Sequence, residues 1–146
     1  MVKQAGVCSK GEFSLFDVIE SIKKKPGYPK AGALGVFVGV VRGETSHGET
    51  VKKLQLEAYE EKADRVLNNI CGELRKRPGV VDVQIHHFVG EFDVSEDVVY
   101  VVVAGAHRTD VFPVLREAVE RYKKEAPIWK KEYLGSKKSY WVSEPH

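Results

Sequence analysis

Two lysines near the carboxyl end of the chain, Lys123 and Lys130, have the residue type and spacing for proton-transfer chemistry. Lys123 lies at the edge of the apolar face of a predicted helix, and Lys130 follows Pro127, which ends that helix. A chain that turns back after the proline could bring the two amines together. Neighbouring cations lower each other's pKa, which suits a lysine that donates or accepts a proton. The alternative is that Lys123 only covers the core edge and pairs with Glu120.

Arginine and histidine side chains follow two apolar segments, in positions that suit an anion site. Arg42 follows the segment 32–41, and His107 with Arg108 follows the segment 98–106 and precedes a predicted helix. A guanidinium binds phosphate or carboxylate through two hydrogen bonds, and a helix N-terminus also favours anions. In the alternative interpretation, these three side chains are solvated residues at strand ends, beside the capping residue of the helix.

The sequence contains no pattern typical of a metal or nucleophile site. Cys8 and Cys71 lie far apart, and neither belongs to a CxxC pair. His86 and His87 lie on opposite faces of one predicted strand, so they cannot bind the same metal ion. Nucleophile elbows, phosphate-binding loops and dinucleotide-binding glycine motifs are also missing from the sequence. We therefore expect neither a metal nor a cofactor.

The elements that must position these residues are predicted in the order αββαββαβ(β). Helices are expected near residues 15–22, 63–74 and 109–122, and strands near residues 32–42, 51–59, 81–89, 98–106, 128–129 and 140–142. Strands 32–42 and 98–106 are apolar throughout, which predicts burial on both faces. A turn-rich connection is expected at 90–96. Because strands follow one another directly twice, we expect an α+β domain with flanking helices and a mixed, largely antiparallel sheet.

The inward faces of the first and last helices follow from helical spacing. On the first helix, Ser14 is the expected N-cap, and the predicted core side chains are Leu15, Phe16, Val18, Ile19 and Ile22. On the last helix, the predicted core side chains are Phe112, Leu115, Val119 and Tyr122. These faces place Lys123 beside the core and Lys124 on the outside.

Length and composition indicate a single globular domain over residues 1–146. The chain has 42% apolar and 30% charged residues, which argues against general disorder. Its net charge of +2 is too balanced for a typical nucleic-acid-binding protein. The longest apolar stretch is far shorter than the roughly 20 residues that a membrane-spanning helix needs. Residues 1–13 lack the apolar segment of a signal peptide, so we expect a cytoplasmic protein with no membrane or nucleic-acid partner.

Seven short motifs carry a family resemblance through their order and spacing. They are Gly32-Ala33, Phe37-x-Gly39-x-Val41-Arg42, Leu56-Glu57-x-Tyr59, His87-x-x-Gly90, His107-Arg108, Lys123-x-x-x-Pro127-Ile128-Trp129-Lys130-Lys131-Glu132 and Trp141-Val142. Together they resemble the large, catalytic subunit of molybdopterin synthase, the MoaE family. The resemblance covers residues 31–142, which is nearly the whole predicted domain.

The resemblance implies a fold, partners and a reaction. The fold is an α/β-hammerhead that forms a homodimer. Each protomer binds a small ubiquitin-like sulfur carrier whose Gly-Gly tail ends in a thiocarboxylate, which gives a heterotetramer with two carriers. Sulfur passes from the carrier to cyclic pyranopterin monophosphate and forms the dithiolene of molybdopterin. An alternative is a noncatalytic module that binds only the carrier, but docking alone would not require both lysines.

The resemblance also implies roles for individual residues. The catalytic residues are Lys123 and Lys130, and the substrate-binding residues are Phe37, Arg42, His107 and Arg108. His107 and Arg108 are expected to reach a site across the dimer interface. The glycines around Phe37 either leave space for an extended ligand or serve sheet packing. After His87 the family usually has an arginine where this chain has Phe88, which weakens the expectation of a role for His87.

Overall fold

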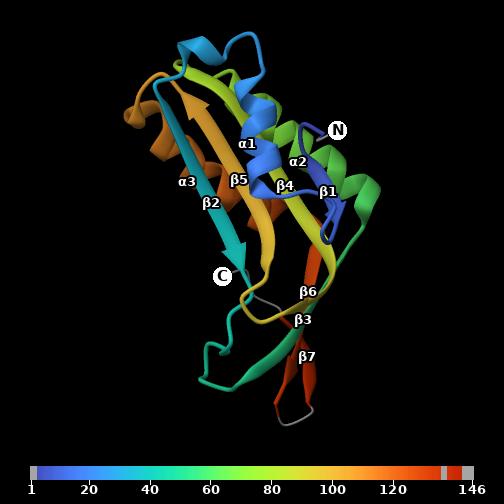
Figure 1. The fold of residues 1–146 in the computed structure, drawn as a ribbon. Helices are drawn as coiled ribbons and strands as arrows, with labels where there is room; N and C mark the ends of the chain where they lie inside the picture. Colours follow the sequence, from blue (N-terminus) through green and yellow to red (C-terminus); the bar gives the residue numbers. More distant parts are fainter. Residues whose placement is uncertain (1–2, 136–137, 143–146) are drawn as a thin grey trace.

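The computed structural model describes residues 3–135 and 138–142 and has an α+β fold with one open sheet. Within these residues, the strands follow the order β2-β5-β4-β3-β6-β7, and β1 lies beside β4 off this path (Figure 1). Neighbours along the path pair antiparallel, and β1 pairs parallel with β4.

The strands are β1 Gly6–Ser9, β2 Ala33–Val40, β3 Val51–Ala58, β4 Val80–Asp93, β5 Asp97–Gly105, β6 Ile128–Leu134 and β7 Ser139–Val142. The helices are α1 Leu15–Lys23, α2 Glu60–Arg75 and α3 Arg108–Glu125, with a 3-10 turn η1 at Tyr28–Lys30. The predicted fold class is confirmed, and β1 is an element that the sequence pattern missed.

Strand β4 belongs to both halves of the sheet. Its residues 80–87 pair with β5, and its residues 90–93 pair with β3. At the junction, Gly90 has a φ of 126°, a conformation that L side chains rarely adopt. Beyond it, β3, β6 and β7 project from the main body of the fold (Figure 1). The predicted turn at 90–96 is therefore wrong in its first residues, because the strand continues to Asp93.

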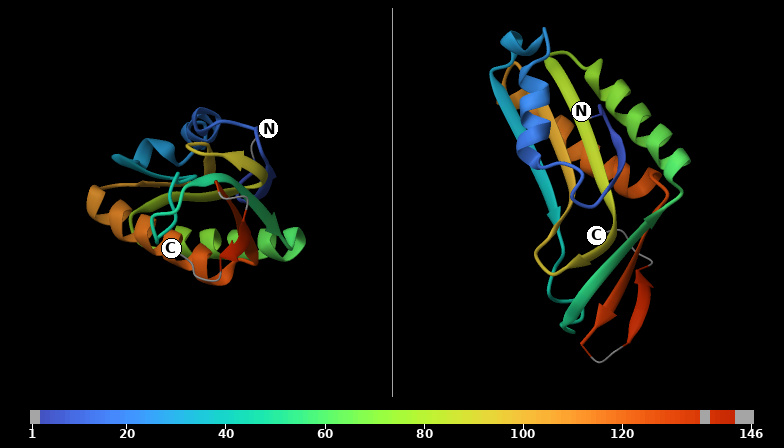
Figure 2. Two further views of the ribbon diagram at one scale, coloured as in Figure 1. Left: turned by 90° about the horizontal axis from the view of Figure 1, so that it is seen from below. Right: turned by 45° about the vertical axis from the view of Figure 1, so that its right-hand side comes forward.

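Two apolar cores lie on opposite faces of the main sheet. Helix α1 covers one face, and α2 and α3 cover the other (Figure 2). The α2–α3 side contains Leu67 and Ile70 from α2 against Val83, Ile85 and other strand residues. The α1 side packs apolar residues of α1 against β4 and β5. In the described part of the chain, no helix combines the length and apolarity needed to span a membrane.

Helix α1 begins as its sequence predicts. The Ser14 hydroxyl accepts a hydrogen bond from the Asp17 backbone N–H, and the Asp17 carboxylate accepts one from the Ser14 backbone N–H. This reciprocal pair satisfies two amide groups that the helix itself cannot bind. Val18 and Ile22 are buried as expected, but Phe16 is 68% exposed. Phe16 was predicted to face the core, and this prediction is wrong because the apolar face of α1 is narrower than the spacing suggests.

Two further predictions of burial are wrong, one for strand β2 and one for Phe112 of α3. Strand β2 lies at the edge of the sheet, and Val36 and Val40 remain exposed, so it is not buried on both faces. On α3, Phe112 is exposed, and Val111 faces the core instead. A Cβ atom at Gly35 would lie only 2.6 Å from Cγ1 of Val111. The missing side chain at Gly35 therefore admits Val111, which turns Phe112 outward.

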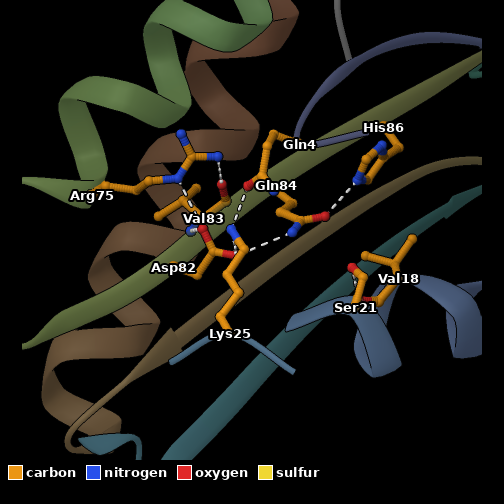
Figure 3. A network of polar contacts seen from close by, with 9 residues as sticks. All are labelled: Gln4, Val18, Ser21, Lys25, Arg75, Asp82, Val83, Gln84 and His86. Atoms are coloured by element: carbon orange, nitrogen blue, oxygen red, sulfur yellow. Dashed lines mark hydrogen bonds and ion pairs between the residues drawn. The ribbon is translucent and has the colours of Figure 1, made fainter. Parts of the chain in front are cut away.

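A buried polar network joins α2 and the turn that follows α1 to β4 (Figure 3). The Asp82 carboxylate is 1% exposed and accepts hydrogen bonds from Arg75 Nε at 2.8 Å and Gln84 Nε2 at 3.0 Å, while the Lys25 ammonium lies 2.8 Å away. Because a carboxylate only accepts, the Gln84 amide nitrogen faces Asp82 and its oxygen faces His86. His86 Nε2 then donates to Gln84 Oε1 at 2.7 Å, so its buried Nδ1 carries the lone pair. These hydrogen bonds therefore place the proton of His86 on Nε2 and keep Asp82 in its charged form.

Candidate active site

A cleft of about 650 Å³ opens where the projecting strands meet the main sheet. Its walls come from β2 and the loop 43–50, from β3, β4 and β5, from the end of α3, and from β6 and β7. The polar and charged side chains that line it are Arg42, Glu44, Thr45, Ser46, His47, Glu49, His87, Tyr122, Lys123, Lys130, Glu132 and Tyr140. The cleft therefore gathers residues from segments that are far apart in the sequence.

Lys123 and Lys130 both line this cleft. Lys123 comes from the last turn of α3, and Lys130 comes from β6 after the chain turns at Pro127. The Pro127 carbonyl accepts a hydrogen bond from the Tyr59 backbone N–H at 3.1 Å, which anchors the turn to the start of α2. Burial and then the positive charge of Lys123 lower the pKa of Lys130. The turn thus places both lysines in one cleft, which agrees with the arrangement expected from the sequence spacing.

Arg42 and Phe37 line the same cleft from β2 and the residues that follow it. The Arg42 side chain is exposed, so its guanidinium is free to meet an anion from solvent. Gly39 lies between them in sequence, and a Cβ atom there would be 2.5 Å from Cγ1 of Val99. Gly39 therefore accommodates the neighbouring strand, which supports the sheet-packing explanation of the glycines around Phe37.

His107 and Arg108 do not line this cleft. They follow the carboxyl end of β5, whereas Arg42 lies beside the start of that strand, where Val40 pairs with Asp97. Nine residues of extended chain span about 27 Å, so the two places are far apart. The His107 side chain is 78% exposed, and its Nδ1 lies 3.3 Å from Asp110 Oδ2. Within one chain, therefore, Arg42 and the His107–Arg108 pair are two separate groups of basic side chains and do not form a single anion site.

His87 is a cleft residue to which the sequence assigned no role. Its side chain is 6% exposed, and its ring packs edge-on against Tyr122 with centroids 5.6 Å apart. Burial lowers the pKa of His87 to about 4, and the charges of Lys130 and Lys123 act in the same direction. The alternation along β4 did place His87 on the α2–α3 side of the sheet. Nothing local in the sequence showed that the end of α3 would open a cleft there.

Aromatic side chains surround the cleft on β6 and β7. Trp129 is 50% exposed, Trp141 is 48% exposed, and both line the cleft. The Tyr140 hydroxyl donates to Glu132 Oε1 at 2.6 Å, which joins the two strands beside Lys130. These rings add apolar surface to a cleft that also contains three cationic side chains and three carboxylates.

Sequence and structure comparisons assign the chain to a known group. A profile of the MoaE protein family matches residues 9–125. The chain belongs to the MoaE family. It is 40% identical over 113 residues to a molybdopterin synthase catalytic subunit of Nostoc sp., which covers 77% of this chain and 68% of that protein. It is 34% identical over 132 residues to a probable molybdopterin synthase of Haloferax volcanii, covering 90% of this chain but only 50% of that longer protein.

Solved structures of MoaE-like proteins share the fold. A molybdopterin synthase from Staphylococcus aureus superposes with a TM-score of 0.86 at 30% identity, covering 99% of this chain and 100% of that chain. A second match is the complex of subunits 1 and 2 of molybdopterin-converting factor from Helicobacter pylori, with a TM-score of 0.76 at 20% identity, covering 97% and 92%. At that identity the second match shows the fold alone. Both the family resemblance and the fold that it implied are confirmed.

Proposed function

We propose that this chain is the catalytic subunit of a molybdopterin synthase, which transfers sulfur from a thiocarboxylated carrier to cyclic pyranopterin monophosphate. The observation that carries the proposal is the cleft of a MoaE-family chain that both Lys123 and Lys130 line. The charge of Lys123 contributes to the lowered pKa of Lys130, which makes proton transfer by a lysine easier at neutral pH. Docking of a carrier alone would not require two amines in one cleft.

Three cationic side chains of the cleft suit the proposed reactants. The sulfur donor is an anionic thiocarboxylate, and the acceptor carries a cyclic phosphate. Lys123, Lys130 and Arg42 offer only hydrogen-bond donors to these anions, whereas Glu44, Glu49 and Glu132 line the same cleft with carboxylates. Phe37 lies on the same wall and offers a ring against which a flat heterocycle can pack.

The proposed assembly is a homodimer that binds two small ubiquitin-like carriers through their Gly-Gly tails. Support for a small-subunit partner comes from the Helicobacter pylori structure, which is a complex of two kinds of subunit. Support for the dimer comes from the distance between Arg42 and the His107–Arg108 pair within one chain. A second protomer would supply His107 and Arg108 and complete the anion site.

The test is product formation in a reconstituted reaction. The purified chain is mixed with thiocarboxylated carrier and cyclic pyranopterin monophosphate, and the dithiolene product is measured. Lys130→Ala should reduce turnover about 10²–10⁴-fold, the usual contribution of a general acid or base. The matched control is Lys131→Ala, because Lys131 is the next residue of β6, points to the other face of the strand and is not among the residues that line the cleft. Carrier binding without product in the wild type would instead identify a noncatalytic module.

A further inference from the structure

His87 is a buried titratable residue of the cleft that the lysine chemistry leaves unused. Its Nδ1 lies 3.0 Å from the backbone carbonyl oxygen of Phe88. A carbonyl oxygen can only accept a hydrogen bond, so Nδ1 carries the proton and donates it. The same contact fixes the orientation of the ring, and packing against Tyr122 supports it from the side.

The second nitrogen of His87 therefore holds a lone pair. With a pKa of about 4, the ring is neutral at pH 7, and Nδ1 already carries its single proton. In residues 3–135 and 138–142, no hydrogen-bond partner is found for Nε2, and the residue lines the cleft. The charged groups that face the ring are Lys123 from α3 and Lys130 from β6, and each lowers its pKa.

The two charged side chains that act on His87 offer only hydrogen-bond donors, because Lys123 and Lys130 are ammonium groups. The cleft also contains the carboxylates of Glu44, Glu49 and Glu132 and the hydroxyl of Tyr122. A neutral imidazole with a fixed tautomer and a lone pair toward the cleft is the arrangement that general base catalysis uses.

We propose that His87 is a catalytic base whose Nε2 accepts a proton from the water that releases the carrier from the transferred sulfur. This inference rests on the proposed function. In that reaction the thiocarboxylate sulfur displaces an oxygen leaving group of the pterin, which leaves a thioester between carrier and pterin. Water must then replace the sulfur on the carrier, because the carrier leaves as a carboxylate.

Release of the carrier is a hydrolysis of the thioester. The water oxygen bonds to the acyl carbon, the carbon–sulfur bond breaks, and sulfur keeps the electron pair as a thiolate on the pterin. One water proton passes to His87 Nε2 and then to solvent, and the other leaves the new carboxyl group. The anionic reactants offset the charges of Lys123 and Lys130, so His87 becomes more basic when the cleft is loaded.

A single-turnover experiment with the thiocarboxylated carrier and cyclic pyranopterin monophosphate tests this role. In His87→Gln, release should slow about 10²–10⁴-fold, and intact-mass spectrometry should detect the accumulated carrier–pterin thioester. The matched control is His86→Gln, because His86 is equally buried but faces Phe13 on the other side of the sheet, with centroids 5.0 Å apart. Release in His86→Gln should match the wild type per folded molecule.

Two outcomes would overturn the inference while the wild type still makes product. One is wild-type release in His87→Gln, and the other is a block before the thioester forms. A wild type that makes no product would instead contradict the proposed function. Should His87→Gln not fold, nitrogen NMR of histidine in the wild-type protein decides the point. We expect a neutral ring protonated at Nδ1 at pH 7, and a proton on Nε2 would refute the role.

Discussion

Lys123 and Lys130 enter one cleft from a helix and a strand, and the charge of Lys123 helps to lower the pKa of Lys130. Replacing Lys123 by Met keeps an apolar stem but removes the charge, so we expect the pKa of Lys130 to rise. NMR titration of the lysine side chains would measure it. Lys124→Met is the matched control, since Lys124 is the exposed neighbour in sequence. An unchanged Lys130 pKa in Lys123→Met would show that burial alone causes the shift.

Mixed dimers should reveal whether two chains share a site. We expect Lys130→Ala and His107→Ala to be inactive alone, because each homodimer lacks one group in both sites. After subunit exchange, one of the two sites in a mixed dimer contains both Lys130 and His107, so activity should return. Native mass spectrometry would verify the exchange, and turnover would be measured on the same sample. A verified mixed dimer without activity would argue that His107 does not act across the interface.

The buried Asp82 carboxylate should make Arg75 important for stability. Burial alone would raise the pKa of Asp82, but hydrogen bonds from Lys25, Gln84 and Arg75 outweigh it and lower the pKa. In Arg75→Met the buried carboxylate loses the positive charge and the hydrogen bond of Arg75. This loss should reduce the free energy of unfolding by about 3 kcal/mol at pH 7. Urea denaturation would measure the loss.

The control for Arg75 lies on the same helix. Arg65 forms only an exposed pair with Glu61 at 3.5 Å, so Arg65→Met should change stability by less than about 0.5 kcal/mol. The stabilisation by Asp82 is present above the pKa of an unfolded aspartate, about 3.9, and is lost as pH falls through the lower folded value. The deficit of Arg75→Met should therefore shrink in acid, and a deficit that grows there would contradict the assignment.

Buried histidines should make the fold sensitive to mild acid. Burial lowers the pKa values of His86 and His87 to about 4, whereas an unfolded histidine titrates near 6.5. Between these values the unfolded chain binds more protons, so stability falls as pH decreases, by about 1.4 kcal/mol per pH unit for each histidine. Denaturation at a series of pH values should show a shallower slope for His86→Gln. His47→Gln, on the exposed loop, should leave the slope as it is.

Local patterns in the sequence sufficed for the helices and for the paired lysines. Ser14 and Asp17 form a capping box within four residues, and the turn that joins Lys123 to Lys130 spans only a few residues more. Such features depend on neighbours in the chain, which a sequence displays directly. The proposed substrate and partners came from the family resemblance, because hydrophobic periodicity in the sequence carries no information about them.

Contacts between distant segments escaped prediction. Strand β1 is short and gains its partner only from β4, about eighty residues later, as in the pairing of Gly6 with His86. The exposure of Phe112 depends on the absent side chain at Gly35, and the apolar run of β2 does not reveal that the strand lies at an edge. The sequence weakened the expectation of a role for His87, because Phe88 follows it, and it did not reveal the position of His87 in the cleft, which exists only after α3 and β6 have packed.

Strand β4 passes through both halves of the sheet, and the cleft lies at the angle between them. The width of the cleft therefore depends in part on the backbone around Gly90. A substitution in the distant core that tilts this strand would move Lys130 relative to Lys123 without touching either residue. The chain consequently cannot be divided into a scaffold and a separable catalytic part, and selection for stability acts on the geometry of the reaction as well.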